Sequence, residues 1–169
     1  MKLFFAMIIL FSQIIFSQGK SEITTDEKTG KPMLVGEVTR EAFEDTSFMW
    51  FDNEYSEYRV DASTIDGLED KISNFNFKII LGTWCEDSQM FVPRLIKIFD
   101  KINIPEQNFN LICVDREKKD LSGEVENLDI QLVPTIIIYS GDQEVGRIVE
   151  APQENLEKDI IRIISKHNF

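Results

Sequence analysis

The chain has 169 residues, of which 43% are hydrophobic and 28% charged. This length and apolar fraction fit one globular domain of about 100–150 residues with an appendage, and they exclude a wholly disordered chain. The 18 lysines and arginines against 30 aspartates and glutamates give a net charge of −12, which argues against nucleic-acid binding and against docking on an anionic membrane.

Residues 1–18 have the pattern of a secretory signal peptide. Lys2 gives a basic start, and residues 3–16 form a mostly apolar stretch that is too short and interrupted to cross a bilayer of about 30 Å. We expect cleavage near Ser17 or Gln18, although no clean A-x-A pattern is present; an uncleaved N-terminal anchor is the alternative. The protein is therefore expected to be exported, to the periplasm, to the medium or as an N-terminally anchored form, with no membrane contact beyond this segment.

Residues 19–59 are predicted to be an N-terminal extension in two parts. Residues 19–33 are polar and lack apolar periodicity, which is typical of a flexible tether. An aromatic arm follows, whose rings either pack onto the main domain or form a partner surface, and we favour packing. The rings of this arm belong to Phe48, Trp50, Phe51, Tyr55 and Tyr58.

From residue 60 onward, strands and helices alternate. Short apolar runs predict four strands, at residues 75–81, 109–114, 135–139 and 145–149. Amphipathic spacing predicts helices at residues 63–74 (capped by Ser63), 85–101, 121–128 and 154–165. This order indicates an α/β domain over residues 60–169, with a central mostly parallel sheet, an antiparallel C-terminal hairpin and helices on both faces.

The residues that carry chemistry lie at 82–88, with the sequence GTWCEDS. Cys85 follows a predicted strand and begins a helix, where unpaired N–H groups and the helix dipole stabilise a thiolate. Trp84 can shield the sulfur and form part of a docking surface. Further on, Pro134 precedes a strand, where a cis bond would turn the backbone toward a ligand.

The remaining titratable residues restrict the kind of site. A single histidine, His167, excludes a multi-histidine metal centre and a histidine-based catalytic pair in a core, and we expect neither a metal nor a cofactor. Cys113 lies in a predicted strand on the same face as Phe109 and Leu111. It is either a small buried hydrophobe or a resolving thiol for Cys85; we favour burial and predict no disulfide between the two cysteines.

These motifs, in this order, resemble the thioredoxin superfamily. The family pattern is a strand, Trp-Cys-x-x-(Cys or Ser), a helix with a proline eight residues after the cysteine, Val-Pro-Thr, a hairpin and a last helix. The matching residues within 60–169 are Trp84, Cys85, Ser88, Pro93, Pro134 and Gly146. The Trp-Cys-x-Asp-Ser motif is also similar to that of exported thioredoxin-like proteins of Bacteroidetes.

The resemblance implies a thioredoxin fold in which a cis bond before Pro134 faces a catalytic Cys85. It also implies that Trp84, Ser88, Val133 and Pro134 bind the substrate, whose chain would add as a strand beside Val133.

Four residues depart from the family pattern, and one of them is Ile79, at the position where many members carry a buried acid. Ser88 replaces the resolving cysteine, and a hydroxyl cannot attack a mixed disulfide. Glu86 and Asp87 place two carboxylates beside the nucleophile, where they oppose the effect of the helix dipole.

Three functions are compatible with this sequence. The first is monothiol thiol–disulfide exchange at Cys85 on protein disulfides or thiols, completed by an external reductant. The second is a redox-inactive binding module that uses the groove around Trp84 and Pro134, and the third is a cell-envelope interaction domain engaged through the aromatic arm.

Overall fold

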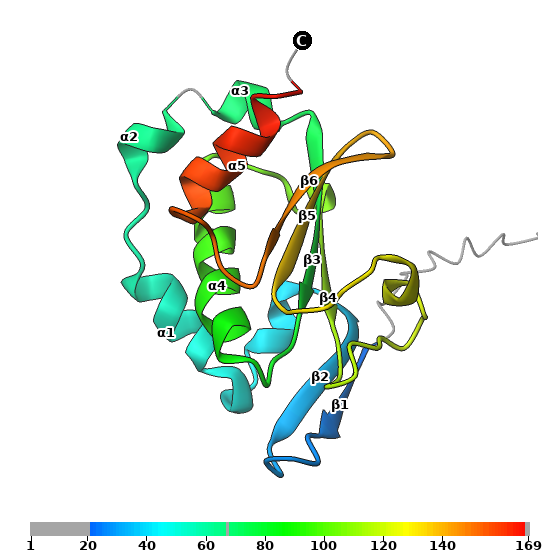
Figure 1. Ribbon diagram of the computed structural model, residues 1–169. Helices are drawn as coiled ribbons and strands as arrows, with labels where there is room; N and C mark the ends of the chain where they lie inside the picture. Colours follow the sequence, from blue (N-terminus) through cyan, green and yellow to red (C-terminus); the bar gives the residue numbers. More distant parts are fainter. Residues whose placement is uncertain (1–20, 67, 168–169) are drawn as a thin grey trace, which may run out of the picture.

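The computed structural model describes residues 21–66 and 68–167, so the predicted signal peptide at 1–18 lies outside the described residues (Figure 1). Six strands form one sheet in the order β1-β2-β4-β3-β5-β6. The strands are β1 (Ser21–Thr25), β2 (Pro32–Val38), β3 (Phe75–Leu81), β4 (Phe109–Cys113), β5 (Thr135–Ser140) and β6 (Gln143–Val149). The α-helices are α1 (Trp50–Glu57), α2 (Ala62–Ile65), α3 (Glu69–Ile72), α4 (Glu86–Lys101) and α5 (Leu156–Ile164). Short 3-10 turns lie at η1 (Arg40–Phe43), η2 (Thr46–Phe48), η3 (Glu106–Asn108) and η4 (Val125–Asn127).

The sheet is mixed and mostly antiparallel, so the prediction of a mostly parallel sheet is wrong. Of its paired strands, β3 and β4 run parallel and the other four pairs are antiparallel. Two of the antiparallel pairs come from β1 and β2, which the sequence does not predict as strands. β5 runs antiparallel to β3 after a connection in which the helix predicted at 121–128 shrinks to η4. Gly123 in this segment has a φ of +76°, which a right-handed helix cannot include. The chain therefore does not cross back, and β5 begins at the end of the sheet where β4 finishes.

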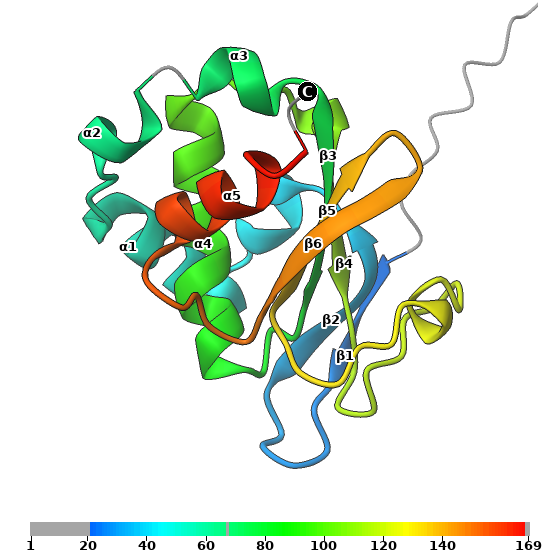
Figure 2. The same cartoon turned by 45° about the horizontal axis from the view of Figure 1, so that its top comes forward.

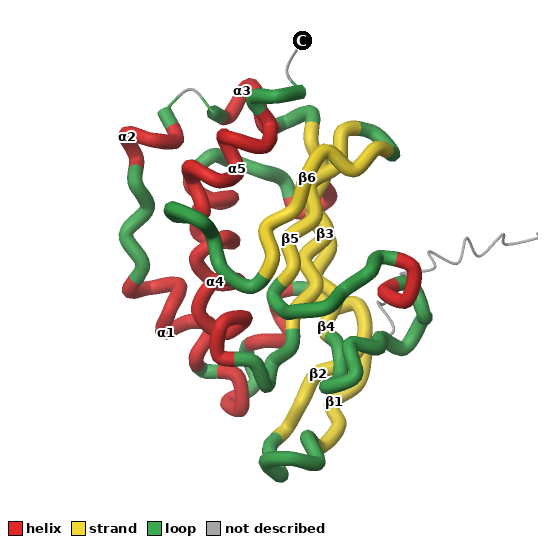
Figure 3. Tube along the Cα trace, in the orientation of Figure 1, coloured by secondary structure: helices red, strands yellow, loops and turns green. Residues whose placement is uncertain are grey.

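The α-helices of the described residues cover one face of the sheet, which corrects the expectation of helices on both faces (Figures 1 and 2). All five bury apolar side chains in the larger core cluster. The opposite face is covered by the loop segment at 114–134, drawn green in Figure 3 apart from η4. A smaller cluster lies under this loop and consists of Ile80, Ile112, Val114, Val125 and Val133.

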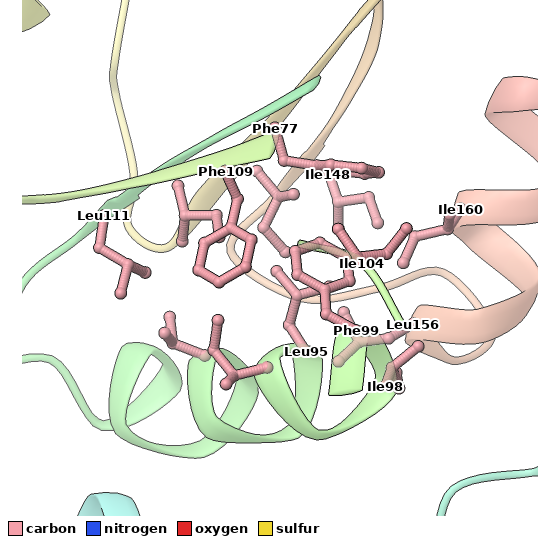
Figure 4. Close-up of a cluster of buried hydrophobic side chains, with 14 of the residues drawn as sticks. Phe77, Leu95, Ile98, Phe99, Ile104, Phe109, Leu111, Ile148, Leu156 and Ile160 are labelled. Carbon is pink, nitrogen blue, oxygen red and sulfur yellow. The ribbon is translucent and has the colours of Figure 1, made fainter. Parts of the chain in front are cut away.

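The larger core forms between α4 and the strands. Leu95 and Phe99 of α4 point toward Phe77 and Phe109 of the sheet, and residues of α5 close the cluster (Figure 4). The ring centroids of Phe77 and Phe99 lie 4.6 Å apart, and those of Phe99 and Phe109 lie 5.3 Å apart. This packing fixes the axis of α4, and therefore the position of its first residue, against the sheet.

Residues 21–33, predicted to be a tether, instead form strand β1 and the start of β2. β2 pairs antiparallel with β4, with Gly36 opposite Cys113, so the central sheet includes residues before the expected domain boundary at 60. Met33, Leu34 and Val35 are buried. β1 is exposed along its whole length and is held by pairing with β2, which explains why no apolar alternation marks it in the sequence.

The helix predicted at 63–74 is divided into α2 and α3. Its cap is Asp61 rather than Ser63, because the Asp61 carboxylate accepts hydrogen bonds from the backbone N–H groups of Ser63 and Thr64. Hydrogen bonds from the Ser63 and Thr64 hydroxyls, followed by these backbone bonds, lower the pKa of Asp61 to about 2. Asp66 has an extended ψ of 125°, which ends α2 at Ile65.

The aromatic arm packs onto the domain, as favoured. Phe48 and Phe51 are buried in the larger core. The Tyr55 hydroxyl donates to Asp100 Oδ2 at 2.7 Å, and the Tyr58 hydroxyl donates to Glu157 Oε1 of α5 at 2.8 Å. Within residues 21–66 and 68–167, none of the helices has both the length and the apolar character that crossing a bilayer requires.

Candidate functional site

The site is built around Cys85, which is the residue before α4 and lies at the end of the loop that follows β3. Its N–H donates to Gly82 O at 2.9 Å, and its carbonyl accepts from Gln89 N at 3.0 Å. The half-buried thiol donates to the Val133 carbonyl at 3.0 Å. The Val133–Pro134 bond is cis, as predicted. The fold thus brings together Cys85, Val133 and Pro134, which are separated by almost 50 residues.

Hydrogen bonds to α4 and to β2 fix the loop before Cys85. Ser88 is fully buried, and its hydroxyl accepts from Gly82 N at 3.2 Å. The Thr83 hydroxyl accepts from Leu34 N of β2 at 3.1 Å. The Gln89 side-chain amide donates to Thr83 O at 2.7 Å. Ser88 therefore shapes the loop from the interior, and its substrate-binding role stays a prediction.

Trp84 is fixed in place beside Cys85. Its indole N–H donates to Val114 O at 2.9 Å, and its ring lies over Gly82 so closely that an added Cβ would be 2.6 Å from Cε2. The ring is half-buried against the smaller apolar cluster. Trp84 consequently offers a surface of fixed shape next to the thiol, as its predicted docking role requires.

Arg116 and Asp26 are parts of the site that sequence reasoning missed. The Arg116 guanidinium lies 4.7 Å from the centroid of the Trp84 ring. Its Nε and Nη2 donate to the two carboxylate oxygens of Asp26 at 2.6 and 2.7 Å. The hydrogen bonds from Arg116 and then from Thr29 hold the pKa of the Asp26 carboxyl well below its usual range. No local pattern marks these residues, since they are 90 positions apart.

Cys113 does not belong to the reactive surface. It is fully buried in the larger core, on the face of the sheet that carries the α-helices, together with Phe109 and Leu111 as predicted. Burial raises the pKa of its thiol strongly. Cys85 packs against the smaller cluster on the other face, and both cysteines are free thiols. The geometry therefore gives Cys113 no role as a resolving thiol for Cys85.

The rim of the site is acidic and partly apolar. Glu86 is exposed and Asp87 half-buried in the first turn of α4. Glu150 is exposed, and its N–H donates to Pro134 O at 2.7 Å. Leu132 and Val149, which flank the Val133–Pro134 bond in sequence and in the sheet, keep about two-fifths of their surfaces exposed, at 43% and 40%. An extended peptide chain could lie along this rim with apolar and basic side chains in contact.

A cavity of about 510 Å³ lies beside Arg116, between the β1–β2 hairpin and residues 115–121. In the described part of the chain, no group of three His, Cys, Asp or Glu side chains is arranged to hold a metal ion.

A mixed sheet, a cysteine at the start of a helix and a cis X-Pro bond facing its sulfur define the class of thioredoxin-fold proteins. The sequence model of the Thioredoxin family matches residues 65–162. The chain belongs to this family. The search of curated proteins found no significant match to this chain.

Solved structures are similar in fold. A protein of unknown function from Pseudomonas aeruginosa matches with a TM-score of 0.52 at 15% identity, over 78% of this chain and 94% of that chain. Thioredoxin O2 from Arabidopsis thaliana, in the oxidized state, matches at 20% identity over 66% of this chain and 84% of that chain, with a TM-score of 0.40. Thioredoxin O1 from the same plant matches at 19% identity, over 70% and 89% of the two chains, also with a TM-score of 0.40. Only the first of these similarities has a TM-score above 0.5, and at 15% identity it concerns the fold alone.

Proposed function

We propose that this protein is an exported monothiol thioredoxin that performs thiol–disulfide exchange at Cys85 on protein substrates. The observation that carries the proposal is the position of the Cys85 sulfur, which is half-buried at the start of α4 and 3.0 Å from the Val133 carbonyl beside a cis proline. A substrate strand that pairs with the backbone at Val133 would bring its own sulfur to this point.

The exchange begins when the Cys85 thiolate attacks one sulfur of a substrate disulfide. A bond forms between the two sulfurs, the substrate S–S bond breaks, and the leaving thiolate takes a proton from solvent. An external thiolate then attacks the Cys85 sulfur and releases the substrate dithiol. A second external thiol frees Cys85, so that one external disulfide is formed for each substrate disulfide reduced. The reverse sequence oxidises a dithiol.

The external thiol is needed because neither internal candidate can release the mixed disulfide. Ser88 carries a hydroxyl, which is committed to Gly82 N in the interior. Cys113 is buried on the opposite face of the sheet. The site should therefore hold mixed disulfides until a thiol from outside resolves them.

Trapping in cells tests this function. On non-reducing gels, the wild-type protein and a Cys113→Ser variant should both carry adducts that reductant removes, while Cys85→Ser should carry none. Ser88→Cys should lose most adducts, because a thiol at this position can resolve them as in C-x-x-C sites; Ser88→Ala is its matched control and should keep them. Absence of adducts in the wild type, or their persistence in Cys85→Ser, would favour a redox-inactive binding groove.

Export is the part of the proposal that rests on residues 1–18. The full chain should be recovered outside the cytoplasm with its N-terminus near Ser17 or Gln18, and a chain lacking residues 1–18 should stay in the cytoplasm. Recovery of the uncut chain in the membrane fraction would identify an N-terminal anchor instead.

A further inference from the structure

The ion pair between Asp26 and Arg116 connects the β1–β2 hairpin to the reactive loop. We infer, resting on the proposed function, that Arg116 is a positioning residue for the Cys85 reaction, held over Trp84 by Asp26 of the hairpin. It supplies a fixed positive charge beside the reactive sulfur.

Three contacts immobilise the Arg116 guanidinium. Two are the parallel hydrogen bonds to the Asp26 carboxylate, at 2.6 and 2.7 Å, and the third is the face of the Trp84 ring, with 4.7 Å between the guanidinium carbon and the ring centroid. Bidentate pairing and ring stacking are the two geometries that suit arginine better than lysine. Arg116 is therefore aligned before any substrate arrives.

Asp26 is itself rigidly placed. It is only 1% exposed, and it stands in the turn between β1 and β2. Its backbone N–H donates to Lys31 O at 2.8 Å, and its carboxylate also accepts from Lys28 N and from the Thr29 hydroxyl. A carboxylate with this many donors stays ionised and keeps its orientation. The hairpin thus acts as a rigid support for Arg116.

The charge of Arg116 reaches the reactive sulfur. Trp84, on which the guanidinium lies, is the residue before Cys85 in the chain. The hydrogen bond and charge of Asp26, followed by the charge of the Cys85 thiolate, raise the pKa of Arg116 against the effect of its burial. The guanidinium lies against the residue before Cys85, so its positive charge stands at the reactive loop, and its sign is opposite to that of the Glu86 and Asp87 carboxylates in the first turn of α4.

The N-terminal hairpin also takes part in the reactive site. Asp26 lies outside the part that matches the Thioredoxin family, residues 65–162. The hairpin is consequently part of the reactive site, because it supplies the counter-ion that orients a charge beside Cys85.

Alkylation of Cys85 by two reagents tests this without any substrate, in a Cys113→Ser background. The ratio of the iodoacetate rate to the iodoacetamide rate reports the local charge, because one reagent is anionic and the other neutral. Arg116→Gln should lower this ratio roughly two- to fivefold, as expected for one unit charge lost several ångströms away in water. Arg116→Lys should restore only part of it, because a lysine makes neither the bidentate pair nor the ring stack. Asp26→Asn removes a negative charge and also frees Arg116, so it should raise the ratio less in the presence of Arg116 than in an Arg116→Gln background, where only the charge is lost.

Arg40→Gln is the matched control. Arg40 makes the same kind of bidentate pair with Asp100, at 3.0 and 2.6 Å, but that pair lies about 22 Å from Cys85 along α4. The ratio of the iodoacetate rate to the iodoacetamide rate in Arg40→Gln should equal the ratio in the Cys113→Ser parent. An unchanged ratio in Arg116→Gln, or an Asp26→Asn effect of equal size with and without Arg116, would overturn the inference while leaving trapped adducts unaffected. Changed ratios without trapped adducts would instead overturn only the proposed function.

Discussion

Gly82 shows how one missing side chain shapes the site. The Trp84 ring occupies the space that a Cβ would need, at 2.6 Å from Cε2 and 2.9 Å from Nε1. The same Nε1 donates to Val114 O, and the ring carries the Arg116 guanidinium. Any residue larger than glycine would therefore displace the ring together with both of its partners.

We predict that Gly82→Ala lowers the free energy of unfolding by about 1–3 kcal/mol, the usual cost of overpacking, and reduces the yield of trapped Cys85 adducts. Urea unfolding and non-reducing gels measure the two effects. In a Trp84→Ala background the same substitution should cost little, because the clashing ring is gone. Equal costs in the two backgrounds would contradict this account.

The two cysteines should differ sharply in accessibility. Cys85 is half-buried at a helix start, whereas Cys113 is fully buried in the core. We predict that a thiol reagent titrates Cys85 alone in the native protein and Cys113 only after denaturation. Finding no thiol in the native protein and both after denaturation with reductant would mean that a disulfide joins them.

At the scale of elements, polar contacts attach the aromatic arm to the helices. Glu157 of α5 is fully buried, and its carboxylate accepts from the Tyr58 hydroxyl at 2.8 and 3.0 Å and from Asp61 N at 3.1 Å. The pKa of Tyr58 is raised strongly by burial and by this hydrogen bond. The tyrosine is thus a neutral donor that satisfies a buried carboxylate.

We predict that Tyr58→Phe lowers the free energy of unfolding by about 1–3 kcal/mol, because the Glu157 carboxylate loses one of its two partner groups while staying buried. Tyr55→Phe is the control. Its hydroxyl bonds to Asp100, which is partly exposed and also paired with Arg40, so its loss should cost less. Urea denaturation measures the free energy of unfolding of both variants. A larger loss of this free energy in Tyr55→Phe than in Tyr58→Phe would contradict the stabilising role of the Tyr58–Glu157 hydrogen bond.

The sequence predicts some of these elements well. β3, β4 and β5 appear within about two residues of their predicted bounds because each is a continuous apolar run, and α4 begins at its predicted cap, Cys85. β1 escapes prediction because both of its faces are exposed. The direction of β5 is also not predicted, since the segment expected to form a helix at 121–128 forms only the short turn η4.

The residues of the candidate site also fall into those that the sequence predicts and those that it does not. Cys85, Trp84 and Pro134 are marked by local spacing around the ends of strands. Arg116 and Asp26 are joined by a contact across 90 residues, which leaves no periodic signal. Ser88 has the position expected of a ligand-binding residue, but the first turn of α4 directs its hydroxyl into the interior.

For the whole molecule, carboxylates attach the N-terminal part to the family domain. Asp26 binds Arg116, Asp100 binds Arg40 and Glu157 binds Tyr58, each across more than 40 residues. The chain has a net charge of −12, and these three acidic residues each accept specific hydrogen bonds within the fold. The hairpin and the aromatic arm are thereby held to the sheet and the helices by hydrogen bonds that carboxyl groups accept.

Acid should therefore weaken the fold through identifiable groups. Hydrogen bonds lower the pKa of Asp61 to about 2, and Arg116 holds the pKa of Asp26 well below its usual range. A carboxyl whose pKa is lower in the folded state contributes stability that is fully present above its unfolded pKa of about 4 and is lost as the pH falls through the folded value.

We predict that the free energy of unfolding, measured in urea, declines between pH 4 and pH 2. The decline should be shallower in Asp26→Asn and Asp61→Asn, because these variants have already lost the ionised group. A slope in both variants equal to that of the wild type would show that other carboxyls control the acid response.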